Sequence, residues 1–295
     1  PHLRGFDVGF NTVVCIKQVP DTENLTGEAM KEDGTVNRSA LPAITNPEDL
    51  NALEMALDVK NRYGGTTTAI TMGPASAAEA LRDALYRGAD RAILLTDRKF
   101  AASDTLATSY ALSCAISALP DPSLVFCGRQ AIDGDTAQIG PQLAEKLDLP
   151  QFTYAEQIRE LSEESITVER NLGTGHEILE GPVPALLTVT ETANLPRPAS
   201  AKRLLKYRHA RTASELEREE GPSPESLAEK GLLIEEWNAS DIGCDPDKCG
   251  GSGSPTKVKK IESVQLVSEE HEQIEPSPEG MNGLVQDLIE EHIIE

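Results

Sequence analysis

"SLVFCGRQAIDGDTAQIGPQLAEKL", residues 123–147, holds an apolar strand, a glycine-containing loop and a helix in direct succession. The strand-like run ends at Gly128, and the pattern predicts a helix that begins near Asp135 or Thr136. In the predicted helix, the apolar residues Ile139, Leu143 and Leu147 recur at four-residue steps, as on one buried helix face. A buried strand that leads through a short loop into such a helix is the building unit of a parallel sheet.

The same alternation precedes this stretch. Strand-like runs at 12–19, 67–73 and 91–97 alternate with amphipathic helical runs at 47–65, 75–89 and 103–119. Strands joined by helices need right-handed crossovers, which place helices on both faces of a parallel sheet. We therefore predict an α/β fold with a mostly parallel sheet, and we expect ligands beyond the carboxyl ends of its strands.

The pattern changes after Pro150. Four shorter strand-like runs, at 152–161, 165–172, 176–181 and 184–190, either extend the sheet or form a small ribbon on it. From Asn194 onward proline, glycine and charge dominate, with helices expected only in 223–232 and 280–293. We predict an α/β domain over 1–193 and an extended C-terminal arm over 194–295 that needs a partner surface.

Composition limits the classes of partner. The chain has 27 Lys and Arg against 49 Asp and Glu, a net charge of −22, which disfavours nucleic acids and anionic membranes. No apolar run is long enough for a membrane-spanning helix, and the first ten residues do not resemble a secretory signal, so we expect a cytoplasmic protein without membrane insertion. Of the five cysteines, Cys244 and Cys249 lack further ligands nearby in sequence for a tetrahedral metal site.

The loop between Gly128 and the predicted helix has the features of an anion-binding turn. Backbone N–H groups at the start of a helix bind anions, and Gly134 and Gly140 allow a ligand close to the backbone. Thr136 and Gln138 can donate hydrogen bonds to phosphate or ribose oxygens, while Asp133 and Asp135 shape the turn or accept from ribose hydroxyls. An ordinary capped helix explains the same residues, and the sequence leaves both interpretations open.

Other strand-end loops point to the same edge of the sheet. Lys17 follows the first strand, Asn46 and Pro47 start a helix, and Met72 and Gly73 end the second strand. Each residue alone is equally compatible with a solvated cation, a helix cap or core packing. Neither a G-x-G-x-x-G nor a G-x-x-x-x-G-K-[ST] motif is present, and the histidines lie away from these loops.

Together these motifs resemble one family. The runs "VVCIKQVPDT", "NPEDLNALEMAL", "TMGP" and above all "GRQAIDGDTAQIGPQLAE" are similar to the beta subunit of electron transfer flavoproteins, from about residue 12 to the end. The resemblance implies a fold like that of adenine-nucleotide alpha hydrolases. It also implies a heterodimer with an alpha subunit that carries FAD, and an adenine nucleotide bound by this chain at the strand-end edge.

The resemblance also implies which residues hold that nucleotide. We expect AMP as a structural cofactor, as in ordinary members, or a second FAD that exchanges hydride with NAD(H), as in electron-bifurcating members. Residues such as Gly134 and Pro141 favour the second branch, and we favour FAD with NAD over AMP. The predicted cofactor-binding residues are Cys15, Lys17, Asn46, Pro47, Asp49, Met72, Gly73, Thr105, Thr108, Asp133, Gly134, Asp135, Thr136, Ala137, Gln138, Ile139, Gly140, Pro141, Leu143 and Ala144.

Two further expectations concern the flavin ring and the redox partner. The small residues 101–103, with Thr105 and Thr108, either line the space for a flavin ring or allow close helix packing. Family members dock an acyl-CoA dehydrogenase through a loop after "PRY", but Pro198 replaces the aromatic residue here. Leu204 and Leu205 then become the candidate anchors, or the partner is another flavoprotein dehydrogenase. A free-standing nucleotide hydrolase or sensor on the same fold is the alternative from another class.

Overall fold

The computed structural model describes residues 9–21, 41–217, 222–257 and 274–290 of the 295-residue chain. The chain's contacts form two compact units, residues 1–258 and 259–295. No helix in the described segments combines the length and the apolar character that crossing a bilayer requires. The predicted arm falls partly outside the described residues, at 218–221, 258–273 and 291–295.

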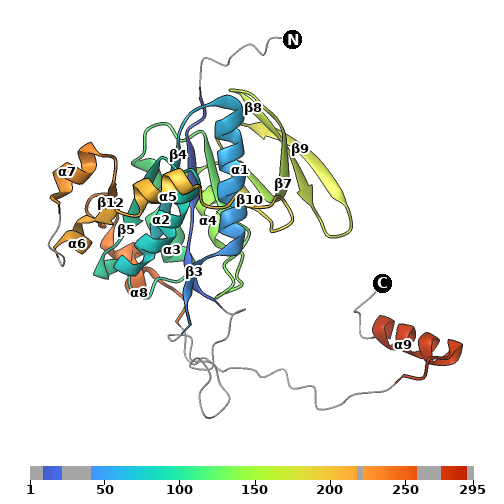
Figure 1. Ribbon diagram of the computed structural model, residues 1–295. Coiled ribbons are helices and arrows are strands. Elements are labelled where there is room, and N and C mark those ends of the chain that lie inside the picture. The colour runs from blue at the N-terminus through green and yellow to red at the C-terminus, as the bar shows by residue number, and fades with distance from the viewer. Residues whose placement is uncertain (1–8, 22–40, 218–221, 258–273, 291–295) are drawn as a thin grey trace, which may run out of the picture. The chain divides into compact units, whose positions relative to one another are not determined.

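The first unit is built on a ten-stranded sheet within the described residues, in the order β11-β12-β5-β4-β1-β6-β10-β7-β8-β9 (Figure 1). The strands are β1 (Thr12–Cys15), β4 (Thr67–Met72), β5 (Arg91–Leu95), β6 (Leu124–Gly128), β7 (Gln151–Leu161), β8 (Ser165–Asn171), β9 (His176–Pro182), β10 (Ala185–Val189), β11 (Arg211–Thr212) and β12 (Leu233–Trp237). Neighbours from β11 to β7 run parallel, and β7, β8 and β9 form antiparallel pairs. The predicted mostly parallel α/β fold is confirmed.

Helices cover both faces of this sheet. They are α1 (Pro47–Tyr63), α2 (Ala78–Arg87), α3 (Thr105–Ser117), α4 (Ile139–Leu147), α5 (Ala201–Tyr207), α6 (Ala213–Leu216), α7 (Pro224–Glu229) and α8 (Gly250–Gly253). Within the described ranges, single turns of 3-10 helix lie at η3 (Ala75–Ala77), η4 (Arg98–Phe100) and η5 (Pro246–Lys248). A two-stranded antiparallel ribbon, β2 (Gln18–Pro20) with β3 (Ala43–Thr45), precedes α1.

Alternating side chains of the central strands build two cores. Val14 and Phe126 pack with α1 and α2 in one cluster, whereas Val13, Ile70 and Val125 pack with α3 and α4 in the other. Successive residues of a strand point to opposite faces, so a strand covered on both sides is buried along its whole length and is mostly apolar. This is why the central strands appear in the sequence as runs of apolar residues with buried threonines among them.

The segment after Asn194 contributes to the sheet. Strand β12 pairs with β5 in parallel, and Arg91 of β5 donates to Glu235 of β12 at 2.5 and 2.7 Å. Sequence analysis placed this charged run in the arm, because its glutamates suggest a solvated segment. As a domain boundary, the division between residues 193 and 194 stays a prediction.

The second unit contains one described helix, α9 (Pro278–Glu290). Met281, Val285 and Ile289 recur at four-residue steps on this helix, and each is about half exposed. The predicted terminal helix is thus present, with an apolar stripe along one side.

Candidate functional site

Two hydrogen bonds from the side chain of Asn46 clamp the loop after β6, which means that they hold its backbone in place. The Asn46 side chain is fully buried; Nδ2 donates to the Gln130 carbonyl at 2.9 Å, and Oδ1 accepts from Ile132 N–H at 3.1 Å. The Asn46 backbone N–H also donates to the Lys17 carbonyl at 2.8 Å. Asn46 occupies the N-cap position of α1, yet its side chain makes no capping bond. Asn46 is therefore the N-cap residue of α1 by position, as the sequence indicated, but its side chain bonds to the loop after β6 and does not cap the helix.

Asp49 joins β1 and β6 from the first turn of α1. Its two carboxylate oxygens accept from the backbone N–H groups of Lys17 at 2.8 Å and Gly128 at 3.1 Å. Burial raises the pKa of Asp49 to about 7, against the opposing effect of these hydrogen bonds, and the charge of Glu48 adds to the rise. A Cβ on Gly128 would lie 2.4 Å from Asp49 Oδ1, so only glycine allows this approach.

Glu48 fixes the next two residues of the loop. Its carboxylate accepts from Arg129 Nη2 at 2.7 Å and from Gln130 N–H at 2.8 Å. The hydrogen bond to Glu48 raises the pKa of the Arg129 guanidinium. Sequence analysis quoted Glu48 and Gln130 within motifs without assigning either a role. Their position beside Asp49 and Gly128 was the available signal.

Helix α4 begins at Ile139, not at Asp135 or Thr136 as predicted. Gly134 N–H and Asp135 N–H both donate to the Ala131 carbonyl, at 3.2 and 2.9 Å, which forms a turn before the helix. Asp135 and Ala137 have positive φ angles of 46° and 52°, which end any helical run. The sequence was misleading because Asp and Thr are preferred at N-caps, and they also favour such turns.

The residues that lead into α4 leave their backbone donors unused. In the described part of the chain, the N–H groups of Thr136, Ala137, Gln138 and Ile139 donate to no acceptor, and Gln138 makes no side-chain capping bond. Gly134 is exposed, and no atom lies within 4 Å of the position that a Cβ would take. Unsatisfied N–H groups at a helix N-terminus attract phosphate oxygens, so this donor set fits a nucleotide's phosphates.

The two aspartates of the loop have separate partners. Lys17 Nζ donates to both oxygens of Asp133, at 2.6 and 2.7 Å, and Gln130 Nε2 donates to Asp135 Oδ1 at 3.0 Å. Asp133 is thereby neutralised, so its charge opposes an incoming anion less. Neither carboxylate caps α4, and both hold the turn.

A side-chain network joins α3 to the start of α4. Thr105 Oγ1 donates to Gln138 Oε1 at 2.7 Å, and Ser109 Oγ donates to Gln142 Oε1 at 3.1 Å. On the inner side of α4, a Cβ on Gly140 would lie 2.3 Å from Thr188 Cγ2 of β10, so glycine lets the helix approach the sheet. These contacts set the angle at which the free N–H groups face the strand-end edge.

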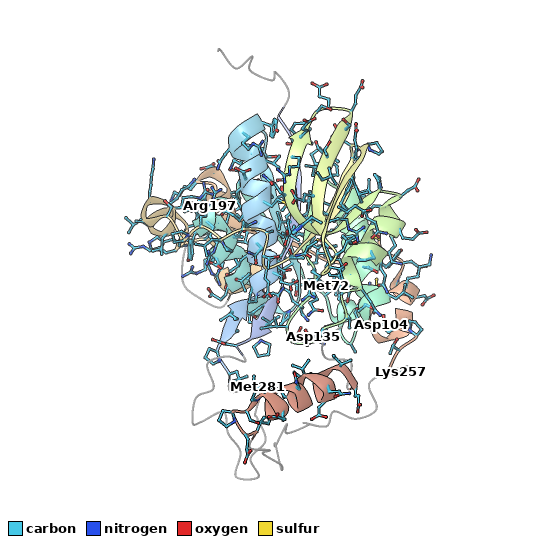
Figure 2. The ribbon with its side chains drawn as sticks, turned by 90° about the vertical axis from the view of Figure 1, so that its right-hand side faces the viewer. Met72, Asp104, Asp135, Arg197, Lys257 and Met281 are labelled. Atoms are coloured by element: carbon cyan, nitrogen blue, oxygen red, sulfur yellow. The ribbon has the colours of Figure 1, made fainter. Side chains whose placement is uncertain are left out.

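The remaining predicted residues lie at the same edge or beneath it. Met72, Asp104 and Asp135 lie at one end of the α/β unit in Figure 2. Leu143 and Ala144 are fully buried on the inner face of α4, and Cys15 is buried beside Cys127, whose thiol pKa is raised by the contact and by burial. Pro47 is exposed, whereas Met72, Gly73, Thr108 and Pro141 are half-buried.

All five cysteines are free thiols, and burial raises the pKa values of Cys244 and Cys249. Within the segments that the structure describes, no group of His, Cys, Asp or Glu side chains has the arrangement of a metal site.

Comparison with known proteins identifies the family. Residues 33–214 match the model of the electron transfer flavoprotein domain, well over half of the chain. The electron transfer flavoprotein subunit beta of Clostridium acetobutylicum is 40% identical over 284 residues, covering 96% of this chain and 100% of the relative. Protein FixA of Sinorhizobium fredii is 42% identical, covering 94% of this chain and 91% of the relative.

A third relative carries a name that includes its partner enzyme. The caffeyl-CoA reductase-Etf complex subunit CarD of Acetobacterium woodii is 40% identical over 247 residues, covering 83% of this chain and 85% of the relative. The matches span nearly the whole chain, including the strand-end loops described above. The chain therefore belongs to the electron transfer flavoprotein family, and it resembles the beta-subunit and FixA members of that family.

Proposed function

We propose that this chain is the beta-type subunit of a heterodimeric electron transfer flavoprotein, and that it binds an adenine nucleotide at the carboxyl edge of its sheet. The observation that supports this most directly is the set of free N–H groups of residues 136–139, held by a loop that Asn46, Glu48 and Asp49 clamp. The clamp fixes the donors before a ligand arrives, which lowers the ordering cost of binding.

We further propose FAD rather than AMP as that nucleotide, with NAD(H) as the hydride partner. Ala101 and Ala102 are exposed in the loop before α3, where small side chains leave room for a ring beyond the phosphates. When bound, the flavin supplies the hydride and electron chemistry, and the chain supplies position and charge. Electrons would then pass to the FAD of the alpha subunit, by bifurcation in the full form of this proposal.

The redox partner is proposed as a flavoprotein dehydrogenase of the acyl-CoA type. The name of the Acetobacterium woodii relative includes an enzyme that acts on a CoA ester. Here Leu195, Leu204 and Leu205 are exposed, the last two on α5, and Leu195 is 90% exposed. Exposed leucines beside a family's docking loop are suitable anchors for a partner surface.

The test is to co-purify this chain with its alpha partner, denature the complex, and count FAD and AMP per heterodimer. Two FAD and no AMP would support the flavin site and its NADH chemistry. One FAD and one AMP would support the alternative, in which the same loop holds AMP as a structural cofactor, and the NADH proposal would be withdrawn. Magnesium-dependent nucleotide hydrolysis by the chain alone would instead support the alternative that this protein is a nucleotide hydrolase.

A matched pair of variants tests the location. Gly134→Trp should reduce the bound nucleotide per heterodimer, because the indole would enter the space in front of the free N–H groups. Gly175→Trp is the control, because Gly175 also has no atom within 4 Å of a Cβ and lies in the β8–β9 turn. Equal nucleotide content in the two variants would contradict the assignment of the site to residues 134–139.

A further inference from the structure

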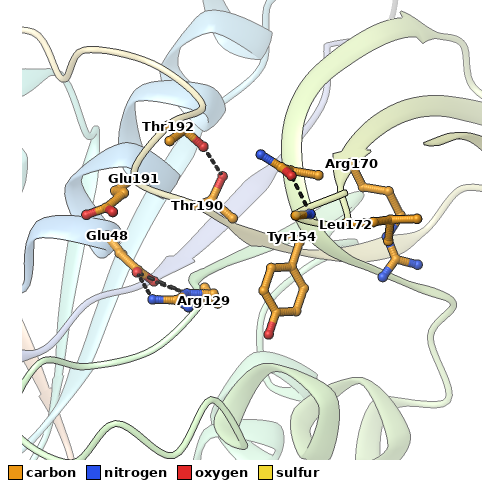
Figure 3. Close-up of a pocket in the computed structure, with 10 residues that line it drawn as sticks. Glu48, Arg129, Tyr154, Arg170, Leu172, Thr190, Glu191 and Thr192 are labelled. Carbon is orange, nitrogen blue, oxygen red and sulfur yellow. Dashed lines mark hydrogen bonds and ion pairs between the residues drawn. The ribbon is translucent and has the colours of Figure 1, made fainter. Parts of the chain in front are cut away.

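A pocket of about 410 Å³ lies beside the clamped loop, among residues outside the predicted nucleotide-binding set. Its walls come from Arg129 after β6, Tyr154 of β7, Arg170 at the end of β8, and the segment Thr190–Thr192 after β10 (Figure 3). Ligand pockets of small molecules have volumes of roughly 300–1,000 Å³, so this one is large enough for a small organic ligand.

The pocket walls are tied together by Glu156 of β7. Its carboxylate accepts hydrogen bonds from Thr192 Oγ1 at 2.5 Å, Asn171 Nδ2 at 2.9 Å and His176 Nε2 at 2.9 Å. These bonds, of which the one from Thr192 has the largest effect, lower the pKa of Glu156. The segment after β10 and the β8–β9 turn are therefore held at a fixed separation.

The guanidinium group of Arg170, which lines the pocket, is incompletely paired. Its Nη2 donates to the Thr153 hydroxyl at 3.0 Å, and the nearest carboxylate oxygen, on Glu177, is 3.6 Å from Nη1. Among the described residues, Arg170 Nε is the one buried side-chain polar atom without a hydrogen-bond partner. A buried donor without an acceptor destabilises the folded chain. Because Nε itself is enclosed, a ligand in the pocket would meet the part of the Arg170 side chain that is exposed, which is 23%.

The carboxylates of the lining do not neutralise Arg170. Glu48 is already bound by Arg129 and by Gln130 N–H, and the Glu191 side chain is exposed. Figure 3 shows the two arginines on either side of the Tyr154 ring. Among the described residues, the carboxylate that pairs with Arg170 is therefore that of Glu177, which lies outside the lining and at a long distance of 3.6 Å.

Tyr154 supplies a flat apolar surface in a constrained conformation. Its φ is +57°, a left-handed value that tyrosine rarely adopts, and its N–H donates to Thr188 Oγ1 at 3.1 Å. Tyr154 as a residue is 41% exposed, and the Arg129 guanidinium carbon lies 5.9 Å from the centroid of its ring. Leu172, which is 50% exposed, adds a second apolar group to the lining.

We propose that this pocket is a second ligand site, which binds a small organic carboxylate with a flat apolar body. The carboxylate accepts from the Arg170 guanidinium, and the body lies against the Tyr154 ring and Leu172. Guanidinium groups pair with carboxylates by charge-assisted hydrogen bonds, and aromatic rings favour flat partners.

The test uses the full-length chain and two isosteric probes, benzoate and benzamide, in calorimetric titrations. Benzoate should bind, and benzamide, which lacks the charge, should bind at least about tenfold more weakly. Arg170→Gln should weaken benzoate binding by about tenfold or more. The control is Arg159→Gln, an arginine of β7 outside the pocket that pairs with Glu169, and it should leave benzoate affinity unchanged.

Equal affinity for the two probes, or benzoate binding unaffected by Arg170→Gln, would overturn the proposal. If Arg170→Gln fails to fold, Arg170→Lys keeps the charge without the planar fork and should still weaken benzoate binding; unchanged affinity there would also refute it. The titration is then repeated on the complex with the alpha subunit. Loss of binding in the complex would overturn the assignment, because the pocket would then belong to a subunit interface.

Discussion

The two halves of the loop after β6 differ in how their polar groups are satisfied. The backbone of residues 128–132 forms hydrogen bonds with the side chains of Asn46, Glu48 and Asp49. In residues 136–139, the N–H groups have no acceptor within the described part of the chain. Within the described residues, four of the five N–H groups of the first half have acceptors in the chain, whereas the second half offers its donors to a ligand. Rigid support under open donors is how a binding site is preorganised.

The largest expected effect is a difference in stability between a variant of the first half and a variant beside the second half. Asp49→Ala leaves the N–H groups of Lys17 and Gly128 without their acceptor, which should lower the free energy of unfolding by about 2 kcal/mol. Asp135→Ala, in the exposed turn directly before residues 136–139, should change it by less than about 0.5 kcal/mol. Denaturant unfolding of the two variants at pH 6 measures the difference. Equal losses would show that the two halves are not distinct.

Two glycines sharpen the comparison. Gly140→Ala places a methyl group 2.3 Å from Thr188 Cγ2, so α4 must move, and we expect a loss of about 1–2 kcal/mol in unfolding free energy. Gly134→Ala meets no atom within 4 Å and should leave stability unchanged. Thermal and denaturant unfolding of both variants provide the check. A destabilised Gly134→Ala would mean that the outer half is already packed.

The pH dependence of stability tests the clamped half alone. Because burial raises the folded-state pKa of Asp49 from 3.8 to about 7, the folded chain holds this proton more tightly than the unfolded chain. The resulting stabilisation is fully present below about pH 4 and is lost as pH rises through about 7. Asp49→Asn should remove this loss, so the stability difference from the unaltered chain should change by more than about 1 kcal/mol between pH 4 and pH 8. Asp135→Asn should run parallel to the unaltered chain.

The smallest effect concerns the ion pair between the two strand-end loops. Lys17 and Asp133 are 49% and 25% exposed, so Lys17→Met should cost less than about 1 kcal/mol of stability. That loss of stability should be smaller in about 0.5 M salt, because dissolved ions screen the attraction between exposed charges. Unfolding curves at low and high salt test this expectation. A large loss of stability that does not depend on salt would show that Lys17, like Asn46, Glu48 and Asp49, is needed to hold the loop after β6.

Much of the fold could be predicted because the central strands are buried on both faces. Val13, Ile70 and Leu94 lie in short runs of apolar and β-branched residues, and these runs became β1, β4 and β5. Strand β12 was missed because Glu235 and Glu236 look solvated. Their carboxylates bind Arg91 and Ser214, and such distant pairing leaves no local pattern in the sequence.

The sequence predicted the location of the site better than it predicted the contacts within the site. The position of Asp49 and Asn46 at a strand-end edge followed from the order of strands and helices. Their contacts did not follow, because both side chains bind backbone groups about 80 residues away, at Gly128 and Gln130. The left-handed residues Asp135 and Ala137 were hidden because neither is glycine. For the same reason the strained Tyr154, and with it the pocket, gave no signal in the sequence.

The pairing of β12 with β5 has a consequence for biosynthesis. Arg91 and Glu235, which join the two strands, are 144 residues apart, so a ribosome must add that length of chain before the edge of β5 can be covered. Until then the nascent protein exposes a parallel strand edge, which is the feature that leads to aggregation. Contacts of such high sequence separation also form late and slowly. Completion of this sheet therefore depends on translation reaching residues that lie well beyond the nucleotide-binding loops.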